Sequence, residues 1–139
     1  MKRGITFETD LFLSRLPFVM DVKPYDWVID DTEMYNPGQP EGRFSGEEFE
    51  KLLKDGDEYN FVRIRRYPVG AKISDISDYS EYLSSDCSFV LLCYDGGFYE
   101  IYDKNEEEIE ALYEECMKIG CENVEMTTDE NDGRYSFHF

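Results

Sequence analysis

Few side chains in this sequence can act as an acid–base group or a nucleophile near neutral pH. One histidine, His138, stands next to the end of the chain, and the four cysteines are Cys87, Cys93, Cys116 and Cys121. A cysteine nucleophile needs a base beside it, and no local signature pairs any of these thiols with His138. A Gly-x-Ser-x-Gly elbow does not occur either. The alternative for His138 is an edge-strand side chain that points to solvent.

Metal ligands are the second kind of chemistry to consider. Zinc is not favoured, because one histidine and cysteines without Cys-x-x-Cys spacing do not form a zinc site. Hard oxygen ligands for Mg²⁺ or Ca²⁺ could come from Asp30, Asp31 and Glu33. The alternative for these three acids is a solvated strand end. We interpret Asn131-Asp132-Gly133 as turn chemistry rather than as a calcium loop, since the loop positions that need acids hold other residues.

A row of glutamates follows one side of the helix expected near the end of the chain. These residues are Glu106, Glu107, Glu110, Glu114 and Glu115. Three of them repeat every four residues and therefore stack on one side of the helix, where they repel each other by a few tenths of a kcal/mol per pair. The helix face is either solvated surface or a negative ridge that docks a basic partner.

Aromatic and basic residues share one face of an expected strand over residues 59–67. That face carries Phe61, Arg63, Arg65 and Tyr67, whereas the opposite face carries Val62 and Ile64. Arginine and tyrosine are enriched in binding hot spots, so we expect a contact surface if helices cover only one face of the sheet. The alternative is arginine stems lying over sheet aromatics.

The elements that position these residues alternate irregularly between strand and helix patterns. Strands are expected near residues 5–8, 25–30, 59–67, 88–94, 98–102, 124–128 and 135–139. Helices are expected over residues 10–16, ended by Pro17, and over 45–54, with a capping box from Ser45 to Glu48. A short helix follows Ser77 or Asp78, and the clearest helix begins after Asp103 or Asn105 and ends at Gly120. Residues 36–42 are expected to form a loop.

This order predicts an α+β fold in a single domain over residues 1–139. We expect a mixed, mostly antiparallel sheet of about six or seven strands and three or four helices, the long ones packed on one face. A chain of 139 residues can bury a core without disulfides or a metal. Its 16% of aromatic residues argues against intrinsic disorder. We expect all four cysteines to be free thiols, with Cys93 and Cys116 in the core and Cys87 and Cys121 partly exposed.

Charge restricts the classes of partner. The net charge of −18 disfavours direct binding to nucleic acid or anionic lipid and steers basic partners toward the surface. The chain begins with charges rather than an apolar run, and no apolar segment reaches the roughly 20 residues of a membrane helix. A cytoplasmic location is therefore expected.

Several stretches together resemble a known family. They are residues 2–8, residues 85–92, Leu112-Tyr113, Gly120 and residues 128–134. Their combination is similar to an uncharacterised family of Bacillus-like Firmicutes, domain of unknown function 2691. The resemblance implies a cytoplasmic bacterial protein, and it provides no catalytic residue to transfer.

These observations lead to a hypothesis about function. We expect a non-enzymatic acidic binding or regulatory protein, immunity-like or inhibitor-like, that needs no cofactor and contacts a basic protein partner. Imitation of nucleic acid phosphates is a narrower version. One alternative is a carboxylate-based enzyme that depends on a divalent cation, and another is a carrier with an apolar cavity between sheet and helices.

Overall fold

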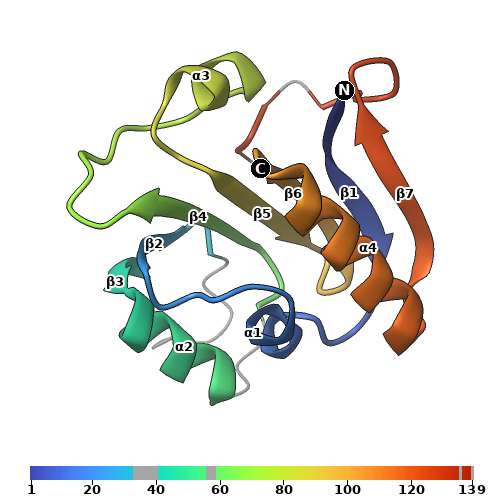
Figure 1. The fold of residues 1–139 in the computed structure, drawn as a ribbon, viewed down its shortest axis with the longest axis horizontal. Helices are drawn as coiled ribbons and strands as arrows, with labels where there is room; N and C mark the ends of the chain where they lie inside the picture. Colours follow the sequence, from blue (N-terminus) through green and yellow to red (C-terminus); the bar gives the residue numbers. More distant parts are fainter. Residues whose placement is uncertain (33–40, 56–58, 135, 139) are drawn as a thin grey trace.

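The computed structural model describes residues 1–32, 41–55, 59–134 and 136–138 (Figure 1). Seven strands form one sheet in the order β3-β2-β4-β5-β6-β1-β7, and all the neighbouring strands pair antiparallel. The strands are β1 (Lys2–Glu8), β2 (Tyr25–Asp30), β3 (Gly42–Ser45), β4 (Val62–Pro68), β5 (Phe89–Tyr94), β6 (Phe98–Asp103) and β7 (Glu122–Thr128). The helices are α1 (Leu16–Val19), which follows a 3₁₀ turn at Leu13–Arg15, α2 (Gly46–Lys54), α3 (Tyr79–Ser84) and α4 (Glu106–Ile119).

Local signals explain where the two long helices begin and end. The Ser45 side chain accepts a hydrogen bond from the Glu48 amide, and the Glu48 side chain accepts one from the Ser45 amide, so the expected capping box starts α2. Asn105 accepts hydrogen bonds from the amides of Glu107 and Glu108 at the start of α4. Gly120 ends α4 in the left-handed conformation, with φ of 79°, which favours glycine.

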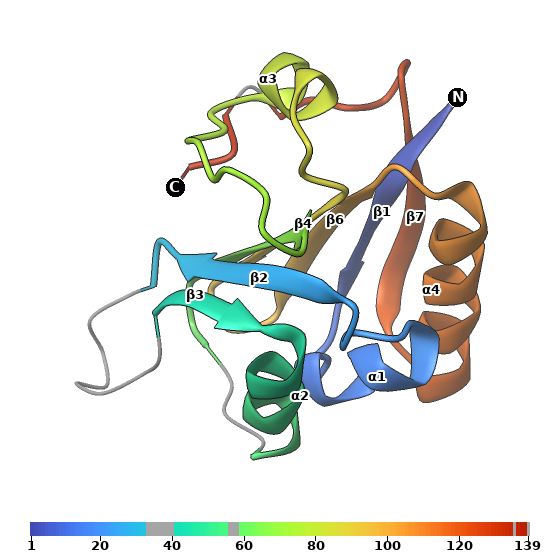
Figure 2. The ribbon, with the colours of Figure 1, turned by 60° about the vertical axis from the view of Figure 1, so that its left-hand side comes forward.

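The sheet separates two apolar clusters (Figure 2). The larger cluster lies on the face covered by α1, α2 and α4, and it is built around side chains such as Trp27, Phe49 and Leu112. The smaller one lies on the opposite face under α3 and the C-terminal segment, with Tyr82, Tyr102 and Phe137 at its centre. The two long helices therefore share one face, as expected.

The α+β class and the number of strands are confirmed, and several details differ. Residues 136–138 form no strand and lie against residues 75–77 instead, where the Phe137 amide donates to the Ser77 carbonyl at 2.9 Å. Pro17 opens α1 rather than ending a helix, because its missing N–H costs nothing in a first turn. The strand β3 was not expected. The expected loop over 36–42 lies mostly outside the described residues.

The cysteines follow the expectation except at one position. All four are free thiols, and Cys93 and Cys116 are buried in the larger cluster. Cys87 is fully buried in the smaller cluster, so its expected exposure is wrong. None of the described helices is long and apolar enough to cross a bilayer.

Candidate functional site

The face of β4 that carries Arg63, Arg65 and Tyr67 is not open. The three side chains are 1%, 3% and 1% exposed, because residues 71–77 and the C-terminal segment cover this part of the sheet. The expected exposure of this face is therefore wrong. Phe61, the fourth residue expected on it, is half-buried and precedes the strand.

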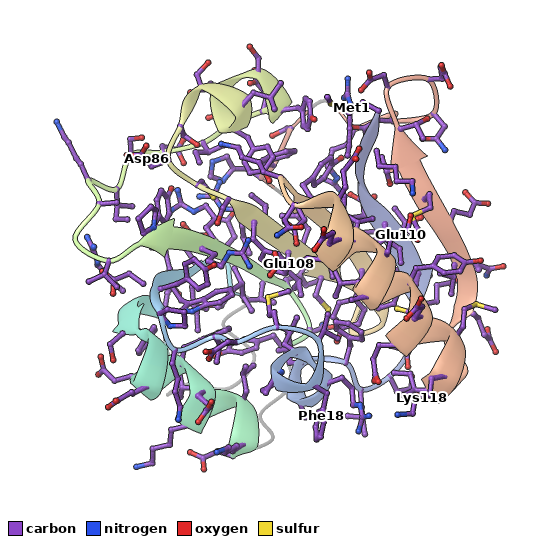
Figure 3. All side chains as sticks on the ribbon, in the orientation of Figure 1. Met1, Phe18, Asp86, Glu108, Glu110 and Lys118 are labelled. Atoms are coloured by element: carbon purple, nitrogen blue, oxygen red, sulfur yellow. The ribbon has the colours of Figure 1, made fainter. Side chains whose placement is uncertain are left out.

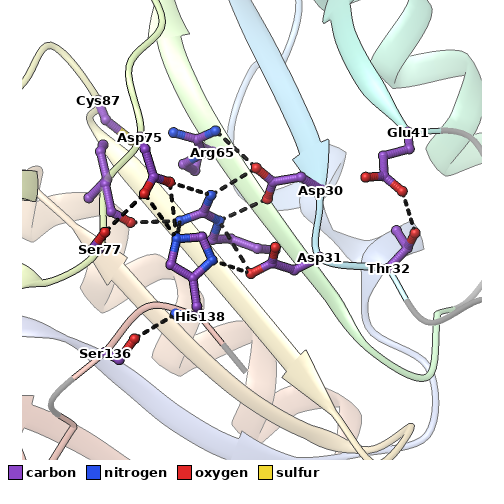
Figure 4. Close-up of polar contacts among 12 residues, drawn as sticks. Asp30, Asp31, Thr32, Glu41, Arg65, Asp75, Ser77, Cys87, Ser136 and His138 are labelled. Carbon is purple, nitrogen blue, oxygen red and sulfur yellow. Dashed lines mark hydrogen bonds and ion pairs between the residues drawn. The ribbon is translucent and has the colours of Figure 1, made fainter.

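Arg63 is held by a fork of hydrogen bonds at the end of β2 (Figure 4). Its Nε and Nη2 atoms donate to the two carboxylate oxygens of Asp30, each at 2.8 Å, and Nη1 donates to the Ile76 carbonyl at 2.6 Å. Burial lowers the pKa of Arg63, but the hydrogen bonds and charge of Asp30 outweigh burial and raise it above its ordinary value. Arg65 donates to the same Asp30 at 3.0 Å. The two buried guanidiniums thus share Asp30, and Arg63 also donates to Asp75 Oδ1 at 3.2 Å.

His138 links the C-terminal segment to this cluster. Its Nδ1 lies 2.7 Å from Asp31 Oδ2 and its Nε2 lies 3.0 Å from Asp75 Oδ1, so each ring nitrogen is within hydrogen-bond distance of a carboxylate. Burial raises the pKa of Asp75, but hydrogen bonds from Ser77, Arg63 and His138 hold it at about 2. Since a carboxylate lies beside each ring nitrogen, His138 connects the C-terminal segment to Asp31 and to Asp75. Sequence spacing did not indicate this contact.

The candidate metal ligands that the structure describes, Asp30 and Asp31, contact basic side chains of the chain itself. Both oxygens of Asp30 accept from arginines, and Asp31 faces His138. Glu33 lies outside the described residues. Within the described part of the chain, no group of three or more His, Cys, Asp or Glu side chains is placed to hold a metal ion.

A third buried arginine lies on the helix-covered face and was not singled out from sequence. Arg66 Nη2 lies 2.9 Å from Glu108 Oε1 and 3.6 Å from Asp103 Oδ1. Figure 3 labels Glu108, which lies in the first turn of α4. Asp103 Oδ2 and Glu108 Oε1 are buried without a hydrogen-bond partner, although Oε1 forms the ion pair. Burial raises the pKa of Asp103 to about 8, and the neighbouring Glu108 carboxylate adds to the rise. A proton on Asp103 leaves Arg66 and Glu108 as a balanced pair.

The glutamates of α4 do not form one continuous ridge. Glu106, Glu107 and Glu114 are exposed, as expected. Glu110 pairs with Lys2 on β1, and Glu115 is only 8% exposed and pairs with Arg15 at 3.1 Å. The expected place of Glu115 on the solvated face is therefore wrong.

A groove is open beside β1, on the sheet face opposite α4 and around the end of the strand as far as Gly120, which ends α4. Three hollows of about 400, 330 and 430 Å³ share lining residues and extend from Thr6 on β1 to Asp10. We call this feature the β1 groove. Its carboxylates are Glu8, Asp10, Asp95, Glu100, Glu122, Glu125 and Asp132. Its basic residues are Arg134, which pairs with Glu100, and His138 at one end.

Replacing Asp30 by Asn tests the compensation of Arg63 and Arg65. The substitution keeps the shape of the side chain and removes its charge, so we expect a loss of about 3 kcal/mol in the free energy of unfolding. Urea denaturation at neutral pH measures the loss. Glu47→Gln, at an exposed residue of α2, is the control and should change stability by less than about 0.5 kcal/mol. A loss as small as that of the control would show that the arginines are solvated.

Replacing Asp103 by Asn tests its raised pKa. Folded Asp103 titrates near 8 and an unfolded aspartate near 3.8, so the folded state binds the extra proton between these values. Stability from this group is complete below about pH 4 and is lost as pH rises toward 8. We therefore expect Asp103→Asn to gain stability relative to the natural protein across this range, as measured by urea denaturation at several pH values. A constant difference from pH 5 to pH 8 would contradict the shift.

Comparisons with known proteins identify the family. The model described as "Protein of unknown function (DUF2691)" matches residues 2–138. The chain is 32% identical to the uncharacterized protein YncE of Bacillus subtilis, over 98% of each chain. No solved structure matches it. The chain therefore belongs to the DUF2691 family.

Proposed function

We propose that this protein is a non-enzymatic binding or regulatory protein whose acidic surface recognises a basic protein partner. The proposal rests on the way in which the chain's own arginines are paired. Every arginine forms an ion pair with a carboxylate of the same chain: Arg3, Arg15, Arg43, Arg63, Arg65, Arg66 and Arg134. The excess of carboxylates is therefore left on the surface.

Burial strengthens this argument. Arg63, Arg65 and Arg66 are at most 3% exposed and contribute little positive field outside the protein. Exposed carboxylates such as Glu106, Glu114 and Glu122 form no ion pair within the described part of the chain. A charge distribution of this kind attracts cationic partners over roughly a screening length, which is about 10 Å at 0.1 M salt.

The contacts of Asp30 and Asp31 and the packing between sheet and helices give less support to a metal-dependent enzyme or a carrier. An enzyme that uses a divalent cation at Asp30 and Asp31 would have to displace Arg63, Arg65 and His138 from these carboxylates. A carrier would need room between sheet and helices, and the hollow beside Phe49 and Leu53 measures only about 10 Å³. That volume holds about one water molecule.

Affinity capture tests the proposed function. The full chain is immobilised, exposed to a Bacillus subtilis lysate at about 0.1 M salt, and eluted toward about 1 M, where screening is nearly complete. We expect a saturable set of basic proteins that elutes with salt. Each is then purified, and its binding to the chain is measured directly.

The matched control is an unrelated domain of similar size and net charge on the same support. Equal capture by both supports would show a polyanion effect and contradict a dedicated binding role. Capture of no basic protein by the chain would contradict it as well.

A further inference from the structure

Five of the seven carboxylates of the β1 groove have neither an ion pair among the described residues nor a place in the first turn of a helix. The carboxylates at the start of α4 interact favourably with the helix dipole, which explains Glu106 and Glu107 without a ligand. In the groove, Glu8 is the strand partner of Glu122 across the β1–β7 pair, next to a register shift between Thr6 and Glu8. Like charges in such a position destabilise a sheet. A cation placed between them would remove this cost.

The cations of the chain do not provide this compensation. Arg134 lies in the groove but pairs with Glu100, and Asp132 already accepts from Arg3 and Tyr102. Within the described residues, Glu8, Asp10, Asp95, Glu122 and Glu125 form no ion pair. Glu8 receives a hydrogen bond from the neutral Asn123 amide. Most of the length of the groove thus presents uncompensated negative charge.

Two further features of the groove suit a peptide rather than a single ion. Phe98 is 40% exposed and stacks on Tyr94, with ring centroids 5.4 Å apart, which provides an apolar contact beside the acids. Thr127 is only 7% exposed, lines the groove, and its hydroxyl has no hydrogen-bond partner among the described residues. This hydroxyl can therefore donate a hydrogen bond to a ligand in the groove or accept one from it.

The shape of the groove limits its occupant further. The hollows join end to end from Thr6 on β1 to Asp10, two residues after the strand ends, which corresponds to about 13 Å at roughly 3.3 Å per residue of extended chain. An extended segment of four or five residues would fill this length, by the same spacing. A second copy of this chain does not suit the groove, because each copy carries a net charge of −18.

We propose that the β1 groove docks an extended, lysine- or arginine-rich segment of the protein partner. This inference rests on the proposed function and assigns the binding of the basic partner to one surface. The basic side chains lie among Glu8, Glu122 and Glu125, and an apolar part of the segment packs on Phe98.

A labelled peptide tests this location. The probe has about ten residues, with lysine at alternate positions and threonine and one leucine between them. Its binding to the full chain is followed by fluorescence anisotropy at about 0.1 M salt, where the screening length is about 10 Å. The same peptide with glutamate in place of lysine is the probe control and should not bind.

Two triple variants with equal loss of charge separate the groove from the helix. The combination of Glu8→Gln, Glu122→Gln and Glu125→Gln should weaken binding about tenfold or more, whereas Glu106→Gln, Glu107→Gln and Glu114→Gln should weaken it about twofold. Phe98→Ala, which leaves the charge unchanged, should also weaken binding severalfold. Circular dichroism and thermal melting confirm that each variant is folded.

The outcomes distinguish this inference from the proposed function. Equal weakening by both triple variants, or stronger weakening by the helix variant, would overturn the groove as the docking site and leave the basic-partner proposal standing. No binding of the lysine peptide to the natural protein would count against both. Nuclear magnetic resonance locates the bound peptide. Changes in the amide chemical shifts of β1 and β7 on titration with the peptide, without changes in α4, would support the groove as the docking site.

Discussion

The neutralisation of three buried arginines on β4 is the constraint on which the rest of the structure depends. A guanidinium cannot be deprotonated to escape the cost of burial, so Arg63, Arg65 and Arg66 require carboxylates and carbonyls within reach. On one face the end of β2 supplies Asp30, and residues 74–76 supply carbonyl oxygens and Asp75. On the other face Glu108 and Asp103 close around Arg66 at the start of α4.

This requirement connects distant segments. The segment that follows β4 folds back over the sheet because its carbonyls accept from Arg63 and Arg65. The C-terminal segment joins the same cluster through His138, which lies between Asp31 and Asp75. The first turn of α4 is tied to β4 through Glu108. The segment after β4 and the C-terminal segment thus cover only part of the sheet face opposite α4. The part of that face beside β1 stays open, and its carboxylates lie in solvent.

Much of the fold could be predicted from sequence because its signals are local. The alternation along residues 62–67 assigns each side chain to its correct face, and the caps at Ser45 and Asn105 fix where the long helices begin. The burial of Arg63 and Arg65 was not predictable, since it depends on a segment without regular structure that lies over them. Periodicity cannot show which half of a sheet face such a segment covers. Glu115 is a similar case, since its burial depends on Arg15, 100 residues away.

Exchange of the arginine side-chain protons with water tests the central claim most directly. Nuclear magnetic resonance of the ¹⁵N-labelled chain resolves these protons, and Arg43, whose side chain is 41% exposed, provides an internal reference. If Arg63 and Arg66 are buried and bound to carboxylates, their guanidinium protons give separate signals that exchange far more slowly than those of Arg43. Exchange of the Arg63 protons at the rate of Arg43 would contradict the account.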